Sequence, residues 1–205
     1  MLKKPFFSIV IPTLNEEKCL PLLFSDLAKQ TYENFEVIHV DGNSEDKTIE
    51  ESKKWKKRIY LKIEKTKIRN VSHQRNLGGK KTRGEWIIFM DADNRLPKYF
   101  LQGIKYRLDR KSETDIFTTW LKVEKQTPKY QSMERAINLG QEIMKNLGKE
   151  VALGAMIGVK KSIFEKIKFD ETQKVVEDSL FVKEVTNAGF IYSLFRDPKY
   201  FYSMR

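Results

Sequence analysis

Cysteine is almost absent from this sequence, since Cys19 is the only one among 205 residues. An intrachain disulfide and a cysteine-based zinc site are therefore excluded. Long apolar runs are also missing: the longest, such as Trp86 to Met90, fall far short of the roughly 20 residues that cross a bilayer. The apolar stretch from Phe6 to Ile11 is too short for a signal-peptide core and has no small-residue cleavage site after it. We therefore expect a cytoplasmic protein without an integral membrane segment.

The glycines do not form either of the common nucleotide-binding motifs. Gly78, Gly79 and Gly84 do not make the dinucleotide fingerprint, and no glycine-rich turn follows the first apolar run. A phosphate-binding loop that ends in Gly-Lys-Ser/Thr is absent as well. A dehydrogenase and a P-loop enzyme are therefore disfavoured.

The charge of the chain is strongly positive, and its composition is that of a folded protein. There are 39 Lys and Arg against 28 Asp and Glu, a net charge of +11, and 40% of the residues are hydrophobic. This content excludes disorder by composition. The positive charge indicates an anionic partner such as nucleic acid, an anionic membrane surface or a phosphorylated small molecule, or else only a solvated surface. No known nucleic-acid-binding signature accompanies the lysines, so that partner is not expected.

Short apolar runs alternate with helical patterns in the first half of the chain. Strands are predicted at 8–11, 35–40, 58–63 and 86–90, and helices at 17–30, 45–55 and 71–82. Ser44 is the predicted N-cap of the second helix, because Glu45 and Asp46 follow it. Repeated strand–helix units predict a mostly parallel sheet with helices on both faces.

The second half is less regular. It is predicted to hold a helix at 97–109, a strand at 115–123, an amphipathic helix at 127–145, a strand at 151–159 and a helix at 176–187. Gly189 should end the last helix, and Gly154 and Gly158 indicate a ligand or another backbone close to the last strand. No repeat or linker divides the chain. We therefore expect one α/β domain, with a nucleotide-binding half at about 1–95 and a more irregular half at about 96–205.

Acidic residues follow the predicted strands at the edge of the sheet where ligands bind. Asp41 comes directly after one strand, and Asp91 and Asp93 come directly after another. Residues two apart in an extended segment point the same way, so Asp91 and Asp93 face one small volume. Such paired carboxylates suit Mg²⁺ or Mn²⁺. The alternative is an acidic turn that only caps the helix near Pro97.

In this order and spacing, several segments resemble glycosyltransferase family 2, the inverting GT-A fold enzymes that use nucleotide-sugar donors. The resemblance covers the chain from about Phe7 to Arg205. It is carried by Ser8-Ile9-Val10-Ile11-Pro12-Thr13-Leu14-Asn15-Glu16-Glu17, Val40-Asp41-Gly42-Asn43-Ser44-Glu45-Asp46-Lys47-Thr48, Arg75-Asn76-Leu77-Gly78, Gly84-Glu85-Trp86-Ile87-Ile88-Phe89-Met90-Asp91-Ala92-Asp93 and Phe169-Asp170-Glu171 with Glu177-Asp178.

The resemblance implies a role for each matching residue. Asp178 would be the general base that deprotonates the acceptor hydroxyl, with a pKa raised by Glu177. Asp93 would bind the divalent ion, Mn²⁺ or Mg²⁺, that carries the diphosphate, and Asp91 would contact this ion or the ribose. The donor would also be bound by Pro12, Thr13, Asn15, Glu16, Asp41 and Arg75. The partners would be a UDP- or GDP-sugar and a sugar or lipid-linked acceptor bound by the second half.

Some features narrow the resemblance, and alternatives stay open. Gly42 stands where many relatives have a second acid, and the Gln-x-x-Arg-Trp motif of processive polymerases is absent. His73 is either a surface residue or a contact to the diphosphate or metal, and the terminal Arg205 is either solvated or a contact to the diphosphate. A polyprenyl-phosphate sugar transferase is the main alternative, with the basic charge in peripheral contact with an anionic membrane. A nucleotidyltransferase is disfavoured, because the segment after the first strand lacks a loop rich in glycine and basic residues.

Overall fold

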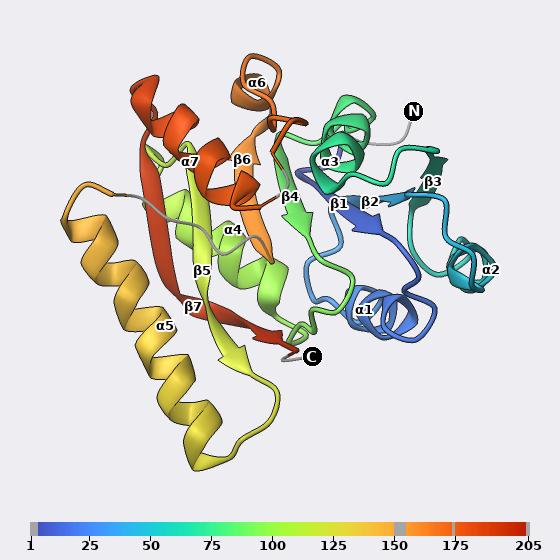
Figure 1. Cartoon of the computed structure of the whole chain (residues 1–205), viewed down its shortest axis with the longest axis horizontal. Coiled ribbons are helices and arrows are strands. Elements are labelled where there is room, and N and C mark those ends of the chain that lie inside the picture. The colour runs from blue at the N-terminus through green and yellow to red at the C-terminus, as the bar shows by residue number, and fades with distance from the viewer. Residues whose placement is uncertain (1–3, 150–154, 174, 204–205) are drawn as a thin grey trace.

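Strands from both halves of the chain share one seven-stranded sheet in the computed structural model, which describes residues 4–149, 155–173 and 175–203 (Figure 1). Its strand order is β3-β2-β1-β4-β6-β5-β7. The strands are β1 (Phe7–Thr13), β2 (Phe35–Asp41), β3 (Leu61–Lys65), β4 (Trp86–Met90), β5 (Ile116–Val123), β6 (Met156–Lys160) and β7 (Tyr192–Tyr202). The helices are α1 (Leu20–Leu27), α2 (Thr48–Lys53), α3 (Val71–Lys80), α4 (Phe100–Arg110), α5 (Pro128–Asn146), α6 (Lys161–Phe164) and α7 (Glu177–Asn187).

The sheet is mostly parallel, as the alternation of strands and helices predicts. β3, β2, β1 and β4 pair in parallel, and β5 pairs in parallel with β7. Only β6 is antiparallel, and it lies between β4 and β5. β1 and β4 are buried along their whole length, which explains why both are apolar runs rather than alternating ones. The carboxyl ends of β1, β2 and β4 therefore lie at one edge of the sheet.

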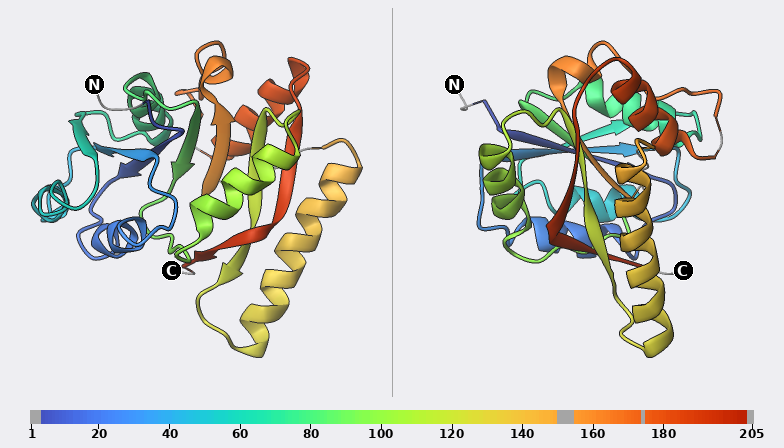
Figure 2. Two further views of the ribbon diagram at one scale, coloured as in Figure 1. Left: turned by 180° about the vertical axis from the view of Figure 1, so that it is seen from behind. Right: turned by 90° about the vertical axis from the view of Figure 1, so that its left-hand side faces the viewer.

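Each face of the sheet has its own apolar core, because successive residues of a strand point to opposite faces. On β1, Phe7, Ile9 and Ile11 pack in the core that α1 and α4 cover. Val10 packs in the opposite core together with residues of α6 and α7. Figure 2 shows helices on both sides of the sheet. The α/β fold with flanking helices is thus confirmed.

The predicted elements lie where the sequence indicates, with some corrections. The strand predicted at 58–63 begins and ends later than expected, as β3 at Leu61–Lys65. Ser44 does not cap α2: the helix begins at Thr48, and Asp46 accepts the Thr48 backbone N–H at 2.9 Å. Gly189, with φ +88°, follows the end of α7 as predicted. The strand β7 was not predicted.

Two further predictions concern glycines and the membrane. The close neighbour of Gly158 is an aromatic ring, because a Cβ at this position would lie 2.1 Å from the Phe117 ring. Gly154 lies outside the described residues. Among the residues that the structure describes, no helix has the length and apolar character needed to cross a membrane.

Candidate active site

The loops after β1 and β2 hold each other through backbone and side-chain hydrogen bonds. Asn15 donates its backbone N–H to Ser44 Oγ at 2.9 Å, and Glu45 donates its backbone N–H to Asn15 Oδ1 at 2.8 Å. The Glu16 backbone N–H donates to Thr48 Oγ1 at 2.7 Å. Asn15 has φ 58°, a conformation that asparagine tolerates better than most residues. The polar residues of both loops thus build one rigid rim at the carboxyl edge of the sheet.

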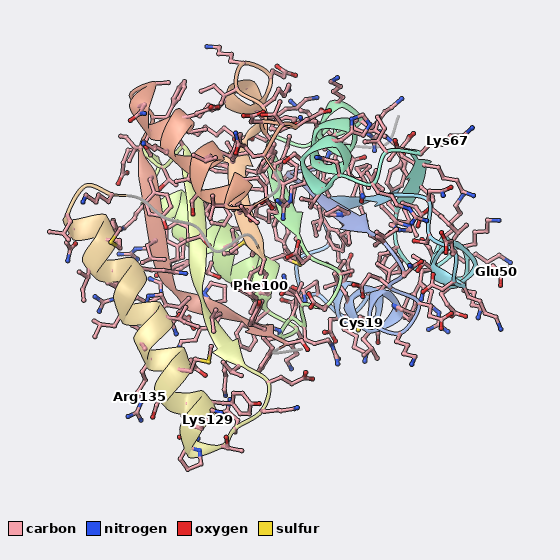
Figure 3. All side chains as sticks on the ribbon, viewed as in Figure 1. Cys19, Glu50, Lys67, Phe100, Lys129 and Arg135 are labelled. Atoms are coloured by element: carbon pink, nitrogen blue, oxygen red, sulfur yellow. The ribbon has the colours of Figure 1, made fainter. Side chains whose placement is uncertain are left out.

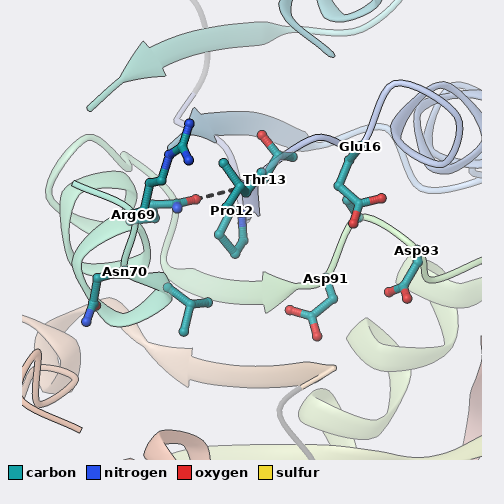
Figure 4. A pocket seen from close by; sticks show the side chains of 11 residues that line it. Pro12, Thr13, Glu16, Arg69, Asn70, Asp91 and Asp93 are labelled. Carbon is teal, nitrogen blue, oxygen red and sulfur yellow. Dashed lines mark hydrogen bonds between the residues drawn. The ribbon is translucent and has the colours of Figure 1, made fainter. Parts of the chain in front are cut away.

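A cavity of about 310 Å³ opens at this edge, between β1, α3 and the loop after β4 (Figure 4). Its lining residues are Pro12, Thr13, Leu14, Glu16, Arg69, Asn70, Val71, Gln74, Asp91, Ala92 and Asp93. In Figure 4 the carboxylates of Glu16, Asp91 and Asp93 lie on one side of the cavity, and Arg69 and Asn70 lie on the other. The sequence prediction missed Gln74, whose Oε1 accepts the Thr13 backbone N–H at 2.9 Å.

Gln74 can bond Thr13 because Gly42, which lies against the Gln74 amide, has no side chain. A Cβ on Gly42 would lie 2.3 Å from Gln74 Nε2. The hydroxyl of Thr13 is held separately, 2.8 Å from Nε2 of His39. Burial lowers the pKa of His39 to about 4, so its ring is neutral at pH 7. The wall of the cavity is therefore fixed by buried polar contacts.

Three of the predicted donor-binding residues, Asn15, Asp41 and Arg75, do not line this cavity. Asp41 accepts the backbone N–H groups of Asn43 and Ser44, each at 3.1 Å, and lines a neighbouring cavity of about 540 Å³. Asn15 bonds the loop after β2, as described above. Their contact with a donor stays a prediction, as does that of Pro12, Thr13 and Glu16, which do line the cavity.

Behind the cavity, one arginine joins three carboxylates. Arg75 of α3 is only 2% exposed. Its Nη1 donates to Asp178 at 2.5 Å and to Glu177 at 3.2 Å, and its Nη2 donates to Asp91 at 3.1 Å. Its guanidinium also lies over the Phe169 ring, 5.2 Å from the centroid. The structure thus shows Arg75 bound to the protein's own carboxylates, and its predicted contact with the donor stays a prediction.

This cluster carries more negative than positive charge, so a carboxyl group in it keeps its proton up to higher pH. Burial raises the pKa of Asp178 to about 7, against the opposing charge of Arg75 and with the help of Glu177 and Asp91. The pKa of Asp91 is raised as well by its enclosure, although Arg75 opposes this. The predicted influence of Glu177 on Asp178 is present, but burial is the larger cause.

The segment before α7 is tied to α3, and this places Asp178. Asn76 accepts the Phe169 backbone N–H at 3.0 Å and donates to the Phe169 carbonyl at 2.8 Å. Glu171 accepts from Asn76 at 2.9 Å, and its other oxygen lies 2.8 Å from Nδ1 of His73. His73 thus contacts this segment of the chain, and Arg205 lies outside the described residues.

Asp91 and Asp93 fit a divalent ion that is shared with a diphosphate. Both line the cavity, and the side chain of Asp91 is 37% exposed. No group of three or more His, Cys, Asp and Glu among the described residues is arranged to hold a metal ion. Mg²⁺ is commonly bound by one or two carboxylates together with substrate phosphates, so a pair of carboxylates suffices when the donor is present.

Comparison with known proteins agrees with this fold. A family model described as glycosyl transferase family 2 matches residues 8–194. The poly(ribitol-phosphate) β-N-acetylglucosaminyltransferase TarP of Staphylococcus aureus is 29% identical over 204 residues, which are 95% of this chain and 61% of TarP. The corresponding TarS of S. aureus is 28% identical over 97% of this chain and 35% of TarS. The chain thus spans less than two thirds of the length of either relative.

Solved structures share the arrangement of the sheet. The crystal structure of S. aureus TarS residues 1–349 with UDP-GlcNAc has a TM-score of 0.77 and 26% identity, over 97% of this chain and 58% of that one. The mannosyltransferase PcManGT of Pyrobaculum calidifontis, solved with GDP-Man and Mn²⁺, has a TM-score of 0.77 and 17% identity over 98% of this chain and 57% of that one. The second likeness is one of fold alone. Since the family model runs from β1 into β7 and the fold agrees with it, the chain belongs to glycosyl transferase family 2.

Proposed function

We propose that this chain transfers a sugar from a nucleoside-diphosphate sugar to a hydroxyl group of an acceptor, with inversion at the anomeric carbon. The observation that carries this proposal is the position of Asp178. Its carboxyl group has a pKa of about 7 and is joined through Arg75 to Asp91, which lines the cavity. A general base works best when its pKa lies near the operating pH.

Direct displacement needs an activated hydroxyl on one side of the anomeric carbon and a stabilised leaving group on the other. Asp178 would take the proton of the acceptor hydroxyl as the new bond to the anomeric carbon forms. Arg75 would hold the Asp178 carboxylate in place, since its guanidinium cannot lose its charge at physiological pH. Asp91 and Asp93 would hold a divalent ion, which supplies positive charge to the departing diphosphate.

UDP-GlcNAc is the first donor to test, and poly(ribitol phosphate) is the first acceptor. TarP and TarS carry N-acetylglucosaminyltransferase and poly(ribitol-phosphate) in their names, and TarS was solved with UDP-GlcNAc. A net charge of +11 suits a polyanionic acceptor. GDP-Man is the comparison donor, because PcManGT shares the fold.

Donor binding and transfer are tested separately. We expect UDP-GlcNAc with Mn²⁺ to raise the melting temperature, because a ligand that binds only the folded state stabilises it. Asp93→Ala should abolish the part of this increase that depends on Mn²⁺. Asp178→Asn should keep the increase and lose transfer by at least a hundredfold, as expected for a general base.

The matched control is Asp109→Asn, which removes an exposed carboxylate on α4. It should bind the donor and transfer the sugar like the unmodified chain. Transfer that persists in Asp178→Asn would exclude Asp178 as the base. If no nucleotide sugar changes the melting temperature with or without Mn²⁺, the proposed reaction is wrong.

A further inference from the structure

The long helix α5 directs polar residues inward, together with the partly buried Tyr130 and Ile137, which pack against the core. The buried residues of this helix are Asn138 and Gln141, both polar. Leu139, Ile143 and Leu147, at the end of the helix, are 59%, 50% and 65% exposed. A surface helix of a globular protein normally has the opposite arrangement, with its apolar stripe toward the core. Figures 1 and 2 show α5 at the periphery of the molecule, beyond β5 and β7.

The inward polar side is explained by the edge of β5. Among the described residues, β6 pairs with β5 only at Ile116 and Phe117, and backbone groups further along β5 find partners in α5. Asn138 supplies two of them: it accepts the Leu121 backbone N–H at 3.1 Å and donates to the Leu121 carbonyl at 2.9 Å. Glu134 accepts the Val123 backbone N–H at 3.0 Å. These bonds fix the rotation of α5 and leave a second row of its apolar residues exposed on the outward side.

The outward side combines apolar residues with basic ones. Its apolar residues recur at helical spacing and are Met133, Ala136, Leu139, Ile143 and Leu147. Lys129 and Arg135, labelled in Figure 3, lie in the N-terminal half of the same helix. Both acids of α5 are directed inward, since Glu134 bonds β5 and Glu142 pairs with Arg196 at 2.9 Å. In the described part of the chain, no ion pair joins Lys129 or Arg135 to a carboxylate.

We propose that the outward side of α5 docks on an anionic lipid surface. A helix with an apolar stripe and basic flanks lies in the plane of the interface, with the stripe among the acyl chains and the bases at the headgroups. A second copy of this chain is a poorer partner. Two copies that each carry +11 repel one another, whereas an anionic surface attracts the chain.

α5 begins after the carboxyl end of β5, at the edge of the sheet that also holds the candidate active site. β5 runs parallel to β4 through the intervening antiparallel β6, and α5 follows the carboxyl end of β5. The docking itself does not depend on the proposed reaction.

Flotation with lipid vesicles tests the proposal. We expect the chain to float with vesicles of phosphatidylcholine and phosphatidylglycerol, and to bind vesicles of phosphatidylcholine alone much more weakly. The double variant Leu139→Glu/Ile143→Glu should weaken binding at least tenfold, because two apolar side chains leave the acyl region. Arg135→Gln should weaken binding about fivefold, which is about 1 kcal/mol, and the loss should shrink in high salt.

Leu22→Glu is the matched control, because Leu22 is a 46% exposed apolar residue on α1. It should float like the unmodified chain. Equal flotation of the double variant and the control would overturn the proposal. A chain that is dimeric in sedimentation, does not float, and becomes monomeric in the double variant would overturn it in favour of self-association. The thermal shift with UDP-GlcNAc is measured on the same variants, so loss of docking and failure of the proposed reaction remain distinguishable.

Discussion

Replacing Asp178 by asparagine should stabilise this protein at alkaline pH. The folded chain holds the Asp178 proton with a pKa of about 7, whereas an ordinary aspartate has 3.8. Folding therefore favours the protonated carboxyl. The stability that follows from this is fully present below pH 3.8 and is lost as the pH rises through about 7. Asparagine resembles the protonated form at every pH, so the variant should not lose this stability.

The size of the effect follows from the same two values. The interval from 3.8 to about 7 is roughly three pH units, and each unit corresponds to about 1.4 kcal/mol. At pH 8 the variant should thus gain up to about 4 kcal/mol in free energy of unfolding, and near pH 4 it should gain almost nothing. The Asp178 side chain is only 14% exposed, so solvent screening removes little of this gain. Arg75 keeps Asp91 and Glu177 as partners in the variant.

Urea denaturation followed by tryptophan fluorescence, repeated from pH 4 to pH 8, measures the difference. The quantity to compare is the free energy of unfolding of the variant minus that of the unmodified chain at each pH. Asp109→Asn serves as the control and should change stability by less than about 0.5 kcal/mol at every pH, as exposed substitutions do. A difference that is constant with pH, or a variant that is less stable at pH 8, would refute the reasoning.

Three further substitutions probe the contacts around the site. Arg75→Met leaves its carboxylates without their cation and should cost about 3 kcal/mol in urea denaturation at pH 8, but less at pH 5, where Asp178, with a pKa of about 7, is protonated; an equal cost at both would contradict this. Gly42→Ala should displace the Gln74 amide from the β1 backbone and cost about 1 kcal/mol, with weaker UDP-GlcNAc binding in calorimetry. Asn138→Ala should cost about 2 kcal/mol in thermal or urea unfolding, because two backbone groups of Leu121 lose their partners.

The sequence predicts the parallel half of the sheet well, since each signal there is local. β4 is a continuous apolar run, β1 and β2 are mostly apolar, and each is followed by polar residues at the edge where ligands bind. An apolar run that is buried on both faces and ends in Asp91 can be identified from a few neighbouring residues. The same reasoning places Asp91 and Asp93 at one cavity, where the structure has them.

The strand β7 could not be predicted in this way. Its middle contains Arg196, Asp197 and Pro198, and proline and charged residues within a run argue against a strand. The structure accommodates this segment because the β5–β7 pairing changes register between Thr119 and Leu121. Such an irregularity depends on the partner strand, which lies about 75 residues earlier in the chain. The residues of β7 alone therefore do not indicate it.

The ion pairs of Arg75, which join the two halves of the chain, could not be predicted from the sequence either. Sequence spacing cannot reveal that Arg75 bonds residues about 100 positions later, because the contact exists only once α3 and α7 pack together. Since Asp91 and Asp178 share this one guanidinium, their titrations are coupled. A positive charge added near Asp91 weakens the bond of this carboxylate to Arg75. Arg75 then binds Asp178 more strongly, which lowers the pKa of Asp178. The ionisation of the proposed base is therefore linked by Arg75 to the charge in the cavity, and a pH profile of transfer should move to lower pH when a cation is bound there.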